Sequence, residues 1–420
     1  MCVFYTSVGG MKAVVWTDVF QLFFMFLSTI TITILATANA GGVSAVFDSN
    51  YQAGRIQFFN MDFDPRERHT FWGTTVGNAV MWLSVFGVSQ TQVQRYLSLP
   101  TITEAKKAVK YNFMMTSLLL VMVGWLGMVL YSTYALCDPI TAKQVRTKDQ
   151  VLPFLVLHIA GDIPGLPGLF MAGVFSGSLS SVSSGLNSLA AIALKDFVSE
   201  QRLSRMSKIQ QALLTKIFSA FFGLVGYSIT FLIRFMPGML EAAMIIGGVI
   251  NGPIIGVFSA GMLLPWVNST GVLGGFLGAI LMCTWIATGG TVYRAYMPYH
   301  SITAPPYPHS TAECPTGWLV GTNTTAVKEE SYLPGHIPLY DISYIWYSCI
   351  GACMTIMLAM LITIFTAQDL SKLDRRLLSP CLARVVECLP GRWGREARQW
   401  LDTEQGEEKA VQLHHMNNKM

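Results

Sequence analysis

The stretch AVVWTDVFQLFFMFLSTITITILATA, residues 13–38, decides the fold. It is apolar or hydroxyl-bearing throughout except at Asp18 and Gln21. About 20 helical residues cross the hydrocarbon core of a bilayer, so we expect a membrane span over residues 12–38. A carboxylate inside a span costs about 2.5–3.5 kcal/mol on insertion scales. Asp18 is therefore expected either to serve an ion or to be wetted by water from the near end of the helix.

The composition extends this conclusion to the whole chain. Of its 420 residues, 52% are hydrophobic and only 12% are charged, and the mean hydropathy is +0.45. A soluble globular protein carries about 25% charged residues. The net charge of +4 is small, and the basic residues form short clusters between apolar runs. The sequence therefore indicates a polytopic membrane protein in a lipid bilayer, with no nucleic-acid partner.

Eight stretches are long and apolar enough to cross a membrane, which predicts an all-α polytopic fold. The predicted spans are 12–38, 70–90, 111–133, 166–194, 209–234, 238–264, 270–290 and 342–366. We expect one transmembrane domain over residues 1–366 and a cytosolic C-terminal tail over 367–420. The chain enters its first span almost at once and has no signal peptide, which is typical of a chain that lacks preceding helices.

The direction of the spans follows from the basic residues between them. The loops 91–110 and 195–208 carry four Lys or Arg each, so the positive-inside rule places both in the cytosol. Asn323 then lies in an outer loop and Asn268 in an inner turn, and both begin glycosylation sequons. We expect only Asn323 to carry a glycan.

The eight cysteines are too sparse for a disulfide scaffold. Cys137 and Cys314 fall in predicted outer loops and are the two that we expect can pair outside. Three others lie inside apolar runs, where cysteine acts as a small packing residue. These three are Cys283, Cys349 and Cys353.

A hydroxyl-rich run, SGSLSSVSSGLNS over residues 176–188, places seven serines inside one predicted span. Sodium prefers oxygen ligands, and hydroxyls with freed carbonyls supply them without a full buried charge. Ser180 and Ser181, with the carbonyl of Gly177 one turn earlier, form the most compact oxygen cluster. Serine-rich faces also let membrane helices pack closely with no ion present, so both interpretations stay open.

Two predicted spans contain helix-breaking residues. Glycines interrupt 70–90, and the run GGVINGP over 247–253 interrupts the sixth span. Unwound backbone inside a membrane occurs only where protein or a water-filled cavity covers it, so such breaks indicate a binding site or simple kinks. In the first of these spans an aromatic stripe either packs or lines a pocket. Arg95, shortly after it, is expected to anchor at the membrane interface.

Signatures of enzymes are missing from the sequence. It has no phosphate-binding loop, no paired-histidine zinc motif and no nucleophile elbow, and its seven histidines lie in loops or tails. We therefore expect no enzymatic activity.

Four stretches together resemble the sodium/solute symporter family. They are GGMKAVVWTDVFQ (9–21), QTQVQRY (90–96), PGLPGLF (164–170) and the serine run. The resemblance is closest to the animal branch of sodium-coupled multivitamin, monocarboxylate and iodide transporters. It implies a partial LeuT-like fold of two inverted five-helix repeats, with Asp18 in the last helix of the first repeat. The first core helices would then be absent from an N-terminally truncated chain.

The resemblance also implies roles for particular residues. The sodium positions are Gly177, Ser180 and Ser181. Positions tied to a second sodium or to coupling are Asp18, Gln21 and Gln90. Positions lining the substrate cavity are Trp82, Val85, Phe86 and Phe258. Phe86 stands where related carriers often have Tyr, which leaves the anion preference open.

The function implied by the resemblance is sodium-coupled symport of a small organic anion or vitamin, such as a monocarboxylate, pantothenate or biotin. Transport would occur across the plasma membrane by alternating access, with Na+ as the coupling ion and no other cofactor. The alternative is a transport-inactive form that associates with the full-length carrier and modulates it.

Overall fold

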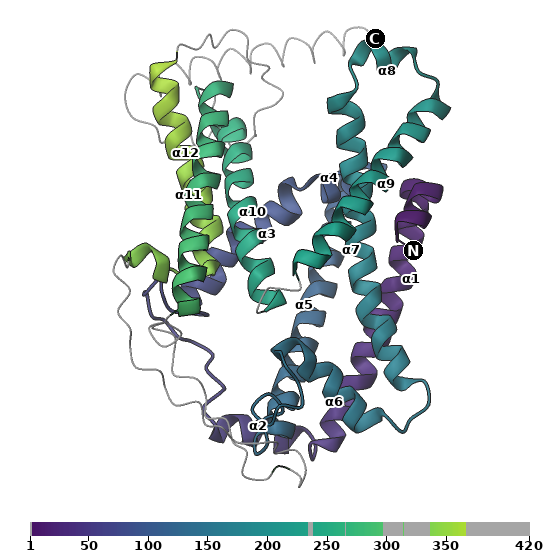
Figure 1. Cartoon of the computed structure of the whole chain (residues 1–420), viewed down its shortest axis with the longest axis vertical. Coiled ribbons are helices and arrows are strands. Elements are labelled where there is room, and N and C mark those ends of the chain that lie inside the picture. Colours follow the sequence, from purple (N-terminus) through teal and green to yellow (C-terminus); the bar gives the residue numbers. More distant parts are fainter. Residues whose placement is uncertain (1, 234–237, 265, 297–313, 315–336, 367–420) are drawn as a thin grey trace, which may run out of the picture. The chain divides into compact units, whose positions relative to one another are not determined.

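The computed structural model of the chain describes residues 2–233, 238–264, 266–296, 314 and 337–366 (Figure 1). Within these ranges every regular element is helical. In this described part of the chain, seven helices are long and apolar enough to cross a membrane. They span Ala13–Asn39, Ile102–Tyr134, Leu166–Phe197, Lys208–Phe231, Met239–Leu263, Ser269–Tyr293 and Tyr344–Phe365. The prediction of a helical polytopic protein is confirmed.

The α-helices are labelled in chain order. They are α1 (Cys2–Asn39), α2 (Val43–Gln52), α3 (Asn78–Leu83), α4 (Gln90–Leu97), α5 (Ile102–Tyr134), α6 (Val151–Ala160), α7 (Leu166–Phe197), α8 (Glu200–Arg205), α9 (Lys208–Ile233), α10 (Met239–Leu263), α11 (Ser269–Tyr296) and α12 (Tyr347–Phe365). Short 3-10 turns lie at Lys148–Gln150, Pro338–Asp341 and Tyr344–Trp346.

The remaining predicted span, 70–90, is an irregular helix. A π-helical turn, η1 (Gly73–Gly77), precedes α3, and a second, η2 (Ser84–Val88), follows it. The apolar run Gly73–Val88 is shorter than the seven long helices. The predicted break is therefore present, as wide turns of the kind that often mark functional sites. After η2 the backbone is extended at Ser89, and α4 begins as a separate helix.

The predicted interruption of the sixth span is wrong. Helix α10 runs unbroken through Pro253. Its partner α12 offers Gly351 at this point, where an added Cβ would lie 2.6 Å from Cδ of Pro253. The proline ring therefore fills space against a glycine. Close packing also explains Gly248, where a Cβ would come within 2.9 Å of the Tyr347 side chain. These glycines let two helices approach and do not unwind one.

The chain divides into two compact units. The first contains α1, α2, α4 to α9 and Cys314, and its centre is α1 packed along α7. At Gly173 of α7 an added Cβ would overlap the hydroxyl and Cβ of Ser28 on α1. Small residues thus bring these two membrane helices together. The apolar core of this unit includes Ile32, Val129 and Leu155, all almost fully buried.

The second unit contains α3 with its two π-helical turns, α10 from Met244 onward, α11 and α12. Its densest packing joins α11 to α12, where a Cβ on Gly275 would lie 2.9 Å from the backbone nitrogen of Ala359. Its apolar core includes Ile286, Tyr344 and Tyr347.

The disulfide prediction is confirmed. Cys137, which follows α5, is bonded to Cys314, and their Cα atoms are 4.9 Å apart. Cys283 is buried and Cys349 partly buried, and both are free thiols, as their places in apolar runs predict. Cys353 is also a free thiol but is exposed on α12.

Asn268 caps the first turn of α11. Its side-chain carbonyl oxygen accepts a hydrogen bond from the Gly271 backbone nitrogen at 2.7 Å. Its amide nitrogen donates to the hydroxyl of Thr366 at 2.6 Å and to the Thr366 carbonyl at 3.2 Å. This side chain therefore joins the start of α11 to the end of α12, and its nitrogen is already used inside the fold.

We predict from this geometry that Asn268 carries no glycan. The amide nitrogen that a glycan would modify is bound to Thr366. Asn323 lies outside the described residues and keeps its sequence-based prediction. Asn323→Gln should remove the mass that a glycosidase releases from the chain made in cells, and Asn268→Gln should leave it unchanged. A glycan lost with Asn268→Gln would contradict both the contact and the predicted topology.

A second prediction concerns the contact of α1 with α7. Gly173→Ala should destabilise the chain by about 1–3 kcal/mol, because overpacking forces the two helices apart. The matched control is Gly185→Ala in the same helix, where a Cβ meets nothing within 4 Å. That control should be neutral or slightly stabilising. Thermal unfolding of both variants in detergent gives the comparison, and equal midpoints would contradict the packing.

Candidate cation-binding site

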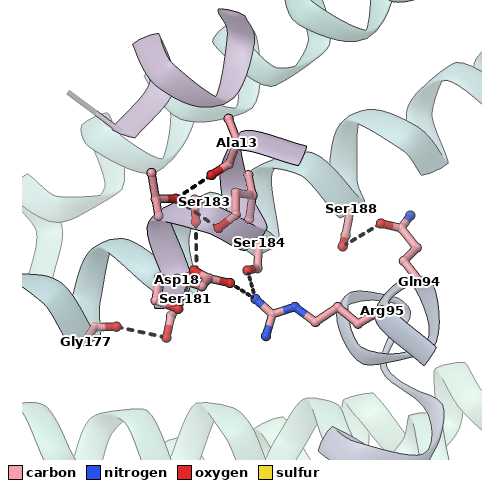
Figure 2. Close-up of polar contacts among 12 residues, drawn as sticks. Ala13, Asp18, Gln94, Arg95, Gly177, Ser181, Ser183, Ser184 and Ser188 are labelled. Carbon is pink, nitrogen blue, oxygen red and sulfur yellow. Dashed lines mark hydrogen bonds and ion pairs between the residues drawn. The ribbon is translucent and has the colours of Figure 1, made fainter. Parts of the chain in front are cut away.

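The centre of the site is Asp18, a carboxylate on α1 that faces α7. Its Oδ1 accepts a hydrogen bond from the hydroxyl of Ser180 at 2.7 Å. Its Oδ2 is ion-paired with the guanidinium of Arg95 (Figure 2). The Asp18 side chain is only 16% exposed, so this charge is largely withdrawn from solvent and is held by one hydroxyl and one cation. The sequence left open whether Asp18 serves an ion or is wetted by water, and the structure shows two side-chain partners instead.

Arg95 reaches Asp18 from the last turn of α4. The same terminal nitrogen that binds Asp18 also donates to the hydroxyl of Ser184 on α7. The Arg95 side chain is 33% exposed. Its interpretation as an interfacial anchor did not include this partner, which holds the guanidinium against α1 and α7.

The serine run lies on α7, with hydroxyls on several sides of the helix. Ser181 is exposed and donates to the carbonyl of Gly177 at 3.3 Å. Ser183 is fully buried and donates to the carbonyl of Ser180 at 3.0 Å. Ser188 donates to the side chain of Gln94 on α4 at 3.3 Å. The run thus serves helix packing and also supplies oxygens around Asp18.

Of the predicted sodium positions, Ser180 is in direct contact with Asp18, and Ser181 and Gly177 are joined to each other one turn away. Hydroxyl and carbonyl oxygens retain lone pairs after accepting or donating one hydrogen bond. These three residues therefore present oxygens of the type that a sodium ion requires.

Gln21 lies one turn after Asp18 on α1 and is 8% exposed. Its side-chain carbonyl oxygen is buried with no hydrogen-bond partner among the described residues. A buried acceptor without a donor is unfavourable unless a cation or water meets it, so Gln21 fits a cation site beside Asp18. Gln90, at the first residue of α4, is exposed. In the described part of the chain the Asp18 carboxylate is bonded to Ser180 and Arg95, and Gln90 is not joined to it.

The predicted substrate residues belong to the second unit. The rings of Trp82 and Phe86 are stacked, with centroids 5.5 Å apart, so they share one face across the start of η2. Val85, the residue before Phe86, is partly buried. Phe258 on α10 lines an apolar pocket of about 330 Å³ with Ile254, Val257 and residues of α11. Within this unit Trp82 and Phe86 thus form an aromatic pair and Phe258 lines an apolar pocket, and Val85 belongs to neither.

Reasoning from the sequence missed two members of the site, Arg95 and Ser184. A usable signal was present, since a carboxylate inside a span needs a partner. Arg95 is the basic residue of the QTQVQRY stretch, and Ser184 lies one turn after Ser180. The folding that brings α4 against α7 is a tertiary contact, which spacing along the chain does not reveal.

Comparison with known proteins places these features in context. Residues 1–279 match the Sodium:solute symporter family. The chain is 36% identical to the human sodium-coupled monocarboxylate transporter 2 over 372 residues, which is 88% of this chain and 59% of the relative. It is 34% identical to the rabbit sodium-dependent multivitamin transporter over 94% of this chain and 62% of the relative.

The fold is also similar to a solved structure, the substrate-bound outward-open state of a Na+-coupled sialic acid symporter. The TM-score is 0.58 at 20% sequence identity, and the match covers 87% of this chain and 65% of that one. The chain spans about three fifths of the length of the curated relatives that it matches. With its membrane helices, its LeuT-like fold and these matches, the chain belongs to the sodium:solute symporter family, a family of transporters and not of enzymes.

Proposed function

We propose that this chain takes part in sodium-coupled symport of a small organic anion or vitamin by alternating access. The observation that carries the proposal is the contact of Ser180 with Asp18, which joins a hydroxyl on one membrane helix to a carboxylate on another. Such an oxygen cluster inside membrane spans is typical of an ion pathway. The named relatives are sodium-coupled carriers of monocarboxylates and vitamins, which supports this substrate class.

The proposed sodium ligands are oxygens of Gly177, Ser180 and Ser181 on α7. Asp18 and Gln21 lie on the neighbouring helix α1, and they supply a negative charge and an unpartnered carbonyl oxygen. We assign these two, with Gln90, to a second ion or to coupling. Sodium acts here as a transported ion, and no other cofactor is proposed.

The proposed substrate contacts are the stacked pair Trp82 and Phe86, together with Val85 and Phe258. Apolar and aromatic walls suit the carbon skeleton of an organic acid. The absence of a hydroxyl at Phe86 favours substrates that are held by apolar contact at this position. The membrane that we propose is the plasma membrane.

The energetics support uphill uptake. Each sodium ion that enters down a membrane potential of 100 mV releases about 2.3 kcal/mol. One or two ions would therefore drive roughly 50-fold to 2,500-fold accumulation of a neutral substrate. An anionic substrate lowers this value by its own charge.

A second candidate function is favoured by the share of the relatives that the chain covers, 59% to 63% for the first two monocarboxylate transporters. In this alternative the 420-residue chain does not transport and instead associates with a full-length carrier and modulates it. Uptake by the chain alone, and by the chain expressed together with such a carrier, separates the two functions.

The predicted result is sodium-dependent uptake of labelled lactate or pantothenate by cells that express the chain. Ser180→Ala should reduce it by about tenfold or more, because it removes an oxygen bonded to Asp18, and tenfold corresponds to 1.4 kcal/mol. The matched control is Ser178→Ala, since Ser178 is exposed on the same helix and donates only to the carbonyl of Val174. Ser178→Ala should transport normally.

Unchanged uptake in Ser180→Ala, at equal surface expression, would remove the sodium assignment. No uptake by the chain alone, combined with altered uptake by a co-expressed full-length carrier, would favour the modulating role.

A further inference from the structure

We propose that Arg95 is a resident cation, whose guanidinium takes the place of a second sodium ion at Asp18. While this contact holds, the chain binds one sodium ion fewer than its oxygen ligands would otherwise allow. The inference rests on the proposed function in one respect, which is that sodium is the ion these oxygens meet.

The first argument is geometric. A single terminal nitrogen of Arg95 donates both to Oδ2 of Asp18 and to the hydroxyl of Ser184 (Figure 2). These two oxygens come from different membrane helices, α1 and α7, and meet at one point. A small cation bound there would need the same two oxygens. The guanidinium therefore occupies a point where two oxygen ligands converge.

The second argument is electrostatic. Asp18 carries one negative charge and Arg95 one positive charge, so the pair is neutral as it stands. A sodium ion at Oδ2 would lie beside the guanidinium and be repelled by it. Arginine stays charged throughout the accessible pH range, so loss of a proton does not vacate the place. Only movement of the side chain, or of α4, can do so.

The third argument concerns the hydrogen bonds that join α4 to α7. Gln94, the residue before Arg95, accepts a hydrogen bond from Ser188 on α7 at 3.3 Å. Two neighbouring residues of this short helix are therefore hydrogen-bonded to α7, Arg95 to Ser184 and Gln94 to Ser188. A shift of α4 would withdraw the guanidinium and release Asp18 together. In this way the number of sodium ions bound is tied to the position of α4.

Other oxygens of the cluster are left free of the guanidinium. The Gln21 carbonyl oxygen has no partner in the described structure, and Ser181 is bonded to Gly177 of its own helix. One sodium ion can therefore bind with Arg95 in place. Removal of Arg95 should add a site and should not merely strengthen the existing one.

The test is a sodium titration of the purified 420-residue chain in detergent, with choline holding the ionic strength constant and the thermal unfolding midpoint as the readout. Arg95→Gln should lower the half-saturating sodium concentration by about tenfold and steepen the dependence. Asp18→Asn combined with Arg95→Gln should lose this gain. Free guanidinium ion should oppose sodium in Arg95→Gln and not in the wild type.

Arg66→Gln is the control for removing an arginine that is ion-paired with an aspartate. Arg66 is paired with Asp64 on the surface at 2.7 Å, and this variant should titrate like the wild type. Arg95→Met, which also removes the charge, provides a second measurement if Arg95→Gln does not fold. It should show the same lowered half-saturating sodium concentration, and a wild-type response would overturn the proposal. Arg95→Lys keeps a positive charge and should titrate like the wild type.

The outcomes separate this inference from the proposed function. If the wild type responds to sodium and Arg95→Gln responds identically, the resident-cation role is overturned and the proposed function stands. A response in Arg95→Gln alone supports the resident cation and contradicts sodium binding by the unaltered chain. If neither the wild type nor Arg95→Gln responds to sodium, both the resident-cation role and the proposed function are overturned.

Discussion

The ion pair between Asp18 and Arg95 is the interaction on which the site depends. A carboxylate inside a membrane span is unfavourable without a partner, and here the partners come from two other helices. Ser180 of α7 and Arg95 of α4 bind the carboxylate of α1, and Ser184 of α7 accepts a hydrogen bond from the same nitrogen of Arg95. Each polar group satisfies another, so the position of α4 is linked to the contact between α1 and α7.

Small residues make that arrangement possible. Gly173 lets α1 approach α7 so closely that a single added carbon would overlap Ser28. The contact of Ser180 with Asp18 lies two turns further along the same helix pair. Close packing and the polar cluster are thus two consequences of one interface between α1 and α7. Ser28 packs against Gly173 there, and Ser180 donates a hydrogen bond to Asp18. The structure shows the packing role of the serine run, and its sodium role stays a proposal.

Much of the fold could be predicted from the sequence because membrane spans are local features. The seven long helices follow from runs of apolar residues, and their ends differ from prediction mostly where a helix continues past the hydrocarbon core, as at Ile102. The pairing of Cys137 with Cys314 followed from the predicted sides of the loops. Pro253 was misjudged because its effect depends on Gly351 of another helix. The contact of Arg95 with Asp18 was missed for the same reason, since only tertiary packing brings the two side chains together.

A double-mutant cycle on the ion pair tests the account most directly. Thermal unfolding in sodium-free detergent would be measured for Asp18→Asn, for Arg95→Gln and for the two combined. The account predicts a coupling free energy of about 1 kcal/mol or more, so that the combined variant is less destabilised than the sum of the single variants. Strict additivity would show that the two charges do not meet in the folded chain and would contradict the account.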